Sequence, residues 1–176
     1  EYIRNLIDNN NYDLDYDFWK KEIGSLDEFS QLKIYEDDYC KTQSVKEAVQ
    51  TQSVLDKSKR ERLFNVSKKY GVTISDIMLA SWLQLIHEYS QNKIVGTAIT
   101  ISGREVPIND IENMVGLFIN TVPIFANCID GNIKTFLLSV HDKVRTANEH
   151  YHIGMGDIQN LTGSDNLLVD SLYSYN

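Results

Sequence analysis

The side chains best suited to chemistry lie at the end of an apolar run, Val115 to Pro123. Asn120 and Thr121 interrupt this run with hydrogen-bonding groups, which must find partners in the protein or face a cavity because an unpaired buried polar group is costly. An amide that faces a cavity can donate to a substrate carbonyl, whereas a buried amide can pin the strand by bonding to neighbouring backbone. Pro123 has no N–H for a ladder hydrogen bond, so it indicates an edge strand, a bulge or the end of pairing. Both roles of Asn120 stay open at this point.

A second polar group, Ser102-Gly103-Arg104, precedes this run. Ser102 lacks the Gly-x-Ser-x-Gly frame of a strained nucleophile turn, so we expect no serine nucleophile there. Arg104 follows a glycine at an expected strand exit. Its guanidinium can staple the loop by organising backbone carbonyls, or it can pair with a carboxylate such as Glu112.

The four histidines are not adjacent to one another: His87, His141, His150 and His152. His87 falls late on an expected buried helix, where a satisfied core or boundary histidine is predicted. His141 lies one position off an apolar stripe, so we expect it to be exposed. His150 and His152 could bind a metal as an i, i+2 pair, but the sequence offers no third ligand. We therefore predict no metal site in this chain.

The N-terminal third contains one helix and two strand-like stretches. Residues 13–23 are predicted to form a helix that ends at Gly24, with one apolar face made by Leu14, Phe18, Trp19 and Ile23. Residues 32–35 and 45–55 are polar, alternating stretches, which suit strands with one wet face.

Two further helices follow. Ser58 with Glu61 three residues later predicts a capping box, and Gly71 is placed to end that helix in the left-handed conformation. Thr73 or Ser75 is expected to cap the next helix. Its apolar residues fall nearly all round, so we expect it to be buried against a sheet: Ile74, Ile77, Met78, Trp82, Leu85, Ile86 and Tyr89.

The residues suited to chemistry are expected to sit on two strands and the loop between them. Residues 94–101 predict a strand in which Gly96 marks a close approach that a side chain would not fit. Residues 102–114 are expected to form a loop, and residues 115–125 a second strand.

The C-terminal part predicts a long amphipathic helix, a short helix and a last strand. Apolar residues over 133–147 follow helical spacing, the short helix is expected around residues 157–161, and the strand over about 168–175. Strands interleaved with helices predict an α/β or α+β fold, in which helices pack on a mixed β-sheet.

Composition narrows the class of function. A chain of 176 residues has room for one domain, and its formal net charge of −8 speaks against nucleic-acid binding. The one basic cluster, Lys57 to Arg62, is interpreted as a solvated helix face. Cys40 and Cys128 fit no zinc pattern and are expected to be structural thiols in a reducing cytoplasm. No targeting leader is visible, and no apolar run is long enough to cross a bilayer.

The stretch from Gly96 to Pro123 resembles a signature of the condensation domains of nonribosomal peptide synthetases, which have a chloramphenicol-acetyltransferase-like fold. Other parts of the chain are similar to that family in the same order: Asp17 to Ile23, Thr73 to Trp82, His150 to Ile158 and Leu168 to Tyr175. The similarity covers nearly the whole chain.

One family feature is missing from the sequence. The catalytic motif of these domains is a double histidine followed after three residues by Asp-Gly, and it lies in the N-terminal half. His150-Tyr151-His152 comes nearest, but its next aspartate is Asp157. The resemblance therefore implies that residues 1–176 form the C-terminal lobe of a condensation domain, without the N-terminal lobe that carries the double histidine.

The resemblance implies a function for the complete domain. It would form an amide bond between aminoacyl or peptidyl groups held as thioesters on the 4′-phosphopantetheine arms of donor and acceptor carrier proteins. This lobe would supply channel wall and carrier-protein surface, and would be inactive alone. The channel candidates are Asn120, Thr121, Ser102, Gly103 and Arg104, the last of which could contact the thioester arm or the other lobe. An adenylation domain of the same megasynthetase is a further expected partner.

Two alternatives remain. Epimerisation and heterocyclisation domains use the same fold, and their distinguishing motifs lie mostly upstream. A non-catalytic interaction or scaffold module of the same fold belongs to another class of function. A double histidine with Asp-Gly in the ~150 preceding residues, about one domain's length, would favour the enzyme.

Overall fold

A computed structural model of the chain describes residues 11–26, 49–104, 110–128, 131–164 and 167–175. They contain a small sheet of three strands, β1 (Ile94–Ile101), β2 (Asn120–Asn127) and β3 (Leu172–Tyr173). The helices are α2 (Asn11–Gly24), α4 (Lys57–Tyr70), α5 (Ile74–Ser90), the 3-10 helix η1 (Ile111–Asn113), α6 (Ile133–Glu149) and α7 (Met155–Asn160). Helices packed on a mixed sheet confirm the predicted fold class.

The sheet has the order β2-β1-β3. β1 pairs antiparallel with β2, so that Ile101 lies opposite Asn120, and it pairs parallel with β3. Pro123 lies on β2, which has no partner on its other side among the described strands, so the edge strand is the one of the three predicted alternatives that the structure shows. Gly96 is also as predicted, since a β-carbon there would lie 2.6 Å from the ring of Phe125.

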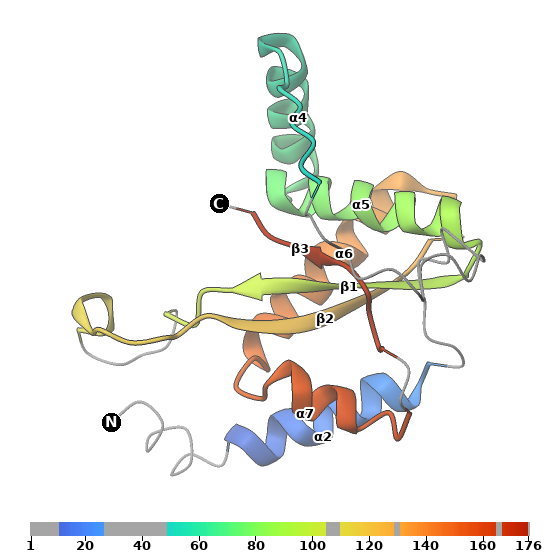
Figure 1. Ribbon diagram of the computed structural model, residues 1–176. Coiled ribbons are helices and arrows are strands. Elements are labelled where there is room, and N and C mark those ends of the chain that lie inside the picture. The colour runs from blue at the N-terminus through green and yellow to red at the C-terminus, as the bar shows by residue number, and fades with distance from the viewer. Residues whose placement is uncertain (1–10, 27–48, 105–109, 129–130, 165–166, 176) are drawn as a thin grey trace.

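The helices surround this sheet on several sides. α6 crosses the strands, α2 and α7 lie side by side beyond the β2 edge, and α5 with α4 lies on the opposite side (Figure 1). The core is one apolar cluster. The sheet and the helices α2, α5, α6 and α7 contribute buried side chains to it, whereas α4 contributes none; examples are Trp19, Leu83, Val95, Val122, Val140 and Ile158. Burying such side chains is the main force that holds the layers together.

The helix ends agree with the sequence in three of four places, the first of which is Gly24 at the end of α2. Gly71 ends α4 with φ 68°, as the sequence predicts. Of the two cap residues that the sequence offers for α5, Thr73 and Ser75, the structure selects Thr73, which also forms a capping box with Asp76 that the sequence analysis did not predict. The start of α4 differs: its cap is Asp56, whose carboxylate accepts from the backbone N–H of Lys59. The predicted box at Ser58 is therefore wrong, because a carboxylate two residues earlier already satisfies a free amide of the first turn.

Three other element predictions need correction. Residues 49–55 form no strand, whereas 32–35 and 45–48 lie outside the described residues. The second strand begins at Asn120 instead of residue 115, and the last strand has two residues. α5 is buried on one face only, since three of its apolar side chains are exposed: Met78, Leu85 and Tyr89. Among the described residues no helix is both long and apolar enough to cross a membrane.

Candidate functional site: the arm and its anchor

The Ser102-Gly103-Arg104 turn is a tight backbone contact. Gly103 is buried and has φ 65°, a left-handed conformation that favours glycine. A β-carbon at Gly103 would overlap the backbone carbonyl oxygen of Phe118, so the chain leaving β1 and the chain approaching β2 touch here. The Tyr151 hydroxyl donates to the carbonyl of Gly103 at 3.3 Å. Ser102 is exposed and accepts weakly from the N–H of Arg104 at 3.4 Å, which gives it no base.

Arg104 staples the loop that follows. Its Nη1 donates to the carbonyl of Ile111 at 2.6 Å and to that of Met114 at 3.2 Å, and its guanidinium lies 4.4 Å from the centre of the Phe118 ring. The geometry is that of an arginine that organises backbone carbonyls, one of the two structural roles expected from the sequence. The side chain of Glu112, the other expected partner, lies outside the described residues.

Residues 110–119, which we call the arm, project beyond the ends of β1 and β2 (Figure 1). The predicted strand over 115–119 is instead an exposed segment: Val115 is fully exposed, Leu117 is 88% exposed and Ile119 is 60% exposed. Three exposed apolar side chains at alternate positions of one segment form a candidate contact surface for another molecule or domain.

Asn120 lies where the arm enters the sheet, and its amide is fully engaged. Nδ2 donates to the backbone carbonyls of Tyr151 and Ile153, the latter at 2.9 Å. Oδ1 accepts from the N–H of Thr121 at 2.8 Å. The amide therefore ties β2 to residues 150–153, which we call the anchor segment, and Thr121 lies beside it opposite Thr100 on β1.

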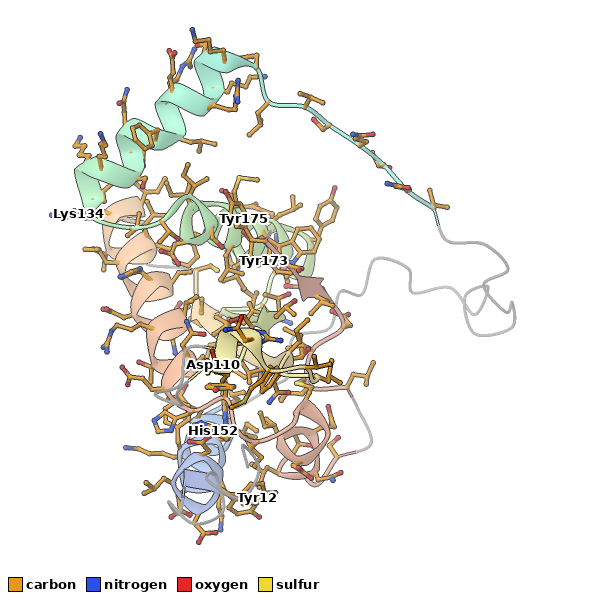
Figure 2. All side chains as sticks on the ribbon, turned by 90° about the vertical axis from the view of Figure 1, so that its left-hand side faces the viewer. Tyr12, Asp110, Lys134, His152, Tyr173 and Tyr175 are labelled. Carbon is orange, nitrogen blue, oxygen red and sulfur yellow. The ribbon has the colours of Figure 1, made fainter. Side chains whose placement is uncertain are left out.

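The anchor segment is held in turn by a carboxylate that the sequence did not single out. Asp15 on α2 is buried, and its two oxygens accept from Nδ1 of His150 at 2.9 Å, Nδ1 of His152 at 2.8 Å and the backbone N–H of His152 at 2.9 Å. Figure 2 shows His152 beside α2. Each imidazole donates from Nδ1, which fixes its tautomer.

Aromatic packing completes the anchor. The ring of Phe18 stacks on His150 with centroids 4.0 Å apart, and Trp19 donates from Nε1 to the carbonyl of His150 at 2.7 Å. Tyr151 stacks obliquely on His152. Both His150 and His152 are thus hydrogen-bonded to the buried carboxylate of Asp15. The described residues contain no cluster of ligands that could hold a metal ion.

The remaining histidines are also occupied. Nδ1 of His87 contacts the carbonyl of Asn92 at 2.7 Å, as expected for a boundary histidine. His141, predicted to be exposed, is half-buried instead, and its Nδ1 lies 2.8 Å from the carboxylate of Asp76. This correction arises because Asp76 is buried at the α5 cap and the imidazole reaches it from the neighbouring α6.

The free thiol of Cys128 has a perturbed pKa. Burial, with a smaller contribution from the carboxylate of Glu88, raises its pKa to about 11. Its Sγ lies 3.8 Å from the carbonyl of Leu83. A thiol with a raised pKa is a poor nucleophile, in agreement with the structural role predicted from the sequence.

Three of the five sequence candidates are thus brought into one connected structure, in which the Gly103 turn, the Arg104 staple and the Asn120 amide join the arm to the anchor segment. Ser102 and Thr121 lie beside it. The sequence missed Asp15, although Asp15, Trp19 and Ile23 share one helical face at i, i+4 and i+8, and all three are buried. A carboxylate on an otherwise apolar face is the signal that could have revealed it.

Comparison with known proteins agrees with this structure. The family model described as "Condensation domain" matches residues 1–176. The chain is 25% identical over 156 residues to gramicidin S synthase 2 of Brevibacillus brevis, which covers 88% of this chain and 4% of that protein.

Two solved structures share the fold. The EpoB cyclization-docking bidomain from Sorangium cellulosum has a TM-score of 0.76 at 17% identity and covers 99% of this chain and 36% of that chain. The first condensation domain of the CDA synthetase has a TM-score of 0.73 at 14% identity and covers 94% of this chain and 35% of that one. The chain spans only 2–4% of the length of the first curated relatives it matches. The match over its whole length shows that the chain belongs to the condensation-domain family.

Proposed function

We propose that this chain is the C-terminal lobe of a nonribosomal peptide synthetase condensation domain. In the complete domain the lobe forms part of the channel in which an amide bond is made between two carrier-bound aminoacyl or peptidyl groups. The observation that carries the proposal is the arm, which presents Val115, Leu117 and Ile119 outward. Arg104 binds backbone carbonyls of the arm, and Asn120 ties the strand that follows the arm to the anchor segment. Such a surface fits a neighbouring lobe and a substrate channel better than open solvent.

The chemistry of the proposed reaction assigns this lobe a positioning role. The amine of the acceptor attacks the carbonyl carbon of the donor thioester, a C–N bond forms, the C–S bond breaks and the thiol leaves with a proton that the amine has lost. The 4′-phosphopantetheine groups of the carrier proteins carry the substrates as thioesters and are long enough to reach into a channel. The part of this group beyond its phosphate is uncharged and is compatible with apolar channel walls. Holding the two groups in line accounts for a large part of the rate in reactions of this kind.

The proton transfer belongs to the other lobe in this proposal. The described histidines of this chain are bound to Asp15, Asp76 or backbone, so none is poised at the arm. A base at the attacking amine is then supplied by the double histidine expected in the N-terminal lobe. Asn120 is a positioning residue: its amide holds the channel wall through the anchor segment and does not contact substrate.

The partners follow from the same proposal. The N-terminal lobe is expected to cover the exposed apolar side of the arm. Donor and acceptor carrier proteins and an adenylation domain of the same synthetase are proposed to deliver the substrates. Among solved relatives, a four-domain nonribosomal peptide synthetase bound to AMP and glycine has a TM-score of 0.63 to this chain at 21% identity, which shows a shared fold within a multidomain protein.

A condensation assay with both loaded carrier proteins tests the proposal. The 176-residue chain alone is expected to give no amide product, and the longer protein that includes the preceding lobe is expected to give it. Amide product from the isolated chain would refute the proposal that catalysis requires the N-terminal lobe. A longer protein that binds both loaded carriers but gives no product would favour the scaffold alternative instead.

A further inference from the structure

Helix α4 has a charge opposite to that of the chain as a whole. Its fourteen residues, KSKRERLFNVSKKY, include six basic side chains and one acidic one, in a chain of formal net charge −8. All six basic side chains are exposed, and no residue of α4 is buried. Figure 1 shows α4 rising from the end of α5 away from the sheet. The proposed channel function makes no use of this helix.

The positive charge of α4 is largely uncompensated. Lys57 pairs with Glu61 at 3.9 Å and Lys59 with Asp56 at 3.6 Å, both on the exposed surface where such pairs are weak. The other four basic side chains form no ion pair with a carboxylate of the described residues: Arg60, Arg62, Lys68 and Lys69. A concentrated charge of this kind steers and orients a partner of opposite sign.

An apolar groove of about 330 Å³ lies beside this charge. Its floor is made by Leu55, Leu63, Val66 and Met78, and the basic side chains of Lys59 and Arg62 also line it. Leu55 is 39% and Met78 is 38% exposed, so apolar surface on the groove floor is open to solvent. An occupant therefore needs both apolar and acidic groups on one face.

α4 also lacks the support that stabilises most helices. A helix without a buried residue gains little from packing, and most helical stability in proteins comes from a packed face. Both of its ends are nevertheless capped, by the carboxylate of Asp56 and by Gly71 in the left-handed conformation. Its apolar side chains Leu63, Val66 and Tyr70 are only partly buried by the residues that the structure describes. A well-formed helix with a partly covered apolar face fits a surface that a partner completes.

We propose that α4 and the groove beside it form a docking surface for an acidic amphipathic helix of a partner protein. The apolar residues of the partner helix would lie in the groove, and its flanking carboxylates would pair with Lys59 and Arg62. A duplex nucleic acid is the disfavoured occupant, because it offers no apolar side chain for the groove and the net negative charge of the chain opposes a polyanion.

The test uses the longer protein that contains this chain and three fluorescent probes. The first is a 21-residue helical peptide with Leu at heptad positions a and d and Glu elsewhere, about three heptads long. The second has Lys in place of every Glu, and the third is a 20-base-pair DNA duplex, about two helical turns. Anisotropy is measured for the wild type and for three variants: Lys59→Glu/Arg62→Glu, Leu55→Ser, and the control Lys20→Glu/Lys21→Glu on the exposed surface of α2.

The expected result is binding of the Glu peptide that weakens at least tenfold in the charge-reversed variant, and measurably in Leu55→Ser, with less than a twofold change in the control. The Lys peptide should not bind. No binding of the Glu peptide, equal binding by the charge-reversed variant, or tighter binding of DNA than of the Glu peptide would each overturn the proposal. Leu55 lies in a segment without regular structure, so its variant tests the groove without threatening the fold.

Discussion

Replacement of Asp15 by alanine should destabilise the chain more than any other single change to a charged side chain on α2. The carboxylate accepts from three donors, the Nδ1 atoms of His150 and His152 and the backbone N–H of His152, at 2.8–2.9 Å. A fully buried donor left without an acceptor costs about 1–3 kcal/mol. These three donors are partly buried, and water entering the space recovers part of that cost. We therefore expect the free energy of unfolding to fall by about 3–5 kcal/mol, a large share of the ~5–15 kcal/mol typical of a domain.

The loss should extend beyond α2, because Asp15 holds the anchor segment and the anchor segment holds Asn120. Urea unfolding followed by tryptophan fluorescence measures the free energy, since Trp19 packs beside this cluster. Asp17→Ala, at an exposed position on the same helix, is the matched control and should change stability by less than about 0.5 kcal/mol. If Asp15→Ala costs less than about 1 kcal/mol, the reasoning from the three donors that bind the buried carboxylate is wrong.

Three further predictions concern single positions. Gly103→Ala should lower the free energy of unfolding by about 2–4 kcal/mol, because it adds a steric overlap at a residue in the left-handed conformation. Gly131→Ala is the control: Gly131 has φ 58° but open space around it, so the loss should be about 1 kcal/mol. Equal melting temperatures of the two variants would contradict this. Asp56→Ala should cost about 1 kcal/mol in thermal unfolding and Ser58→Ala almost nothing, and the reverse order would restore the capping box predicted from the sequence. Cys128, with a pKa of about 11, should react with iodoacetamide at pH 8 about a hundredfold more slowly than an exposed thiol. The rate should rise about tenfold per pH unit toward pH 11, because the thiolate is the reactive form. Peptide mass spectrometry measures the labelling, and a rate at pH 8 equal to that of an exposed thiol would contradict the raised pKa.

The sequence predicts local backbone chemistry well in this protein. Gly71, Thr73 and Pro123 behave as predicted, because a left-handed residue, a cap and a missing N–H depend on the residue's own backbone and its near neighbours. Gly96 also behaves as predicted, although the ring that needs the space, Phe125, lies on the neighbouring strand. The long amphipathic helix over α6 is found for the same reason, since its spacing is a property of one segment.

The sequence predicts the arm and the anchor poorly because both depend on distant partners. Residues 115–119 have the composition of a buried strand, yet they are exposed on the arm. Asp15 is separated from His150 and His152 by more than 130 residues in the sequence, and His141 reaches Asp76 from another helix. Periodicity within one helix contains no information about these contacts.

The most direct test of the proposed function is the condensation rate of the longer protein after single histidine replacements. His141→Ala is the informative change in this lobe, because its ring is 34% exposed and is the most accessible of the three histidines paired with carboxylates. We predict that its rate, measured with both loaded carrier proteins on folded protein, stays within about threefold of wild type. Loss of a histidine from the double-histidine motif expected upstream should lower the rate by about 10²–10⁴, the usual contribution of a general base. A hundredfold loss in His141→Ala, with no loss after the upstream replacement, would contradict the claim that this lobe positions the substrates and leaves proton transfer to the other.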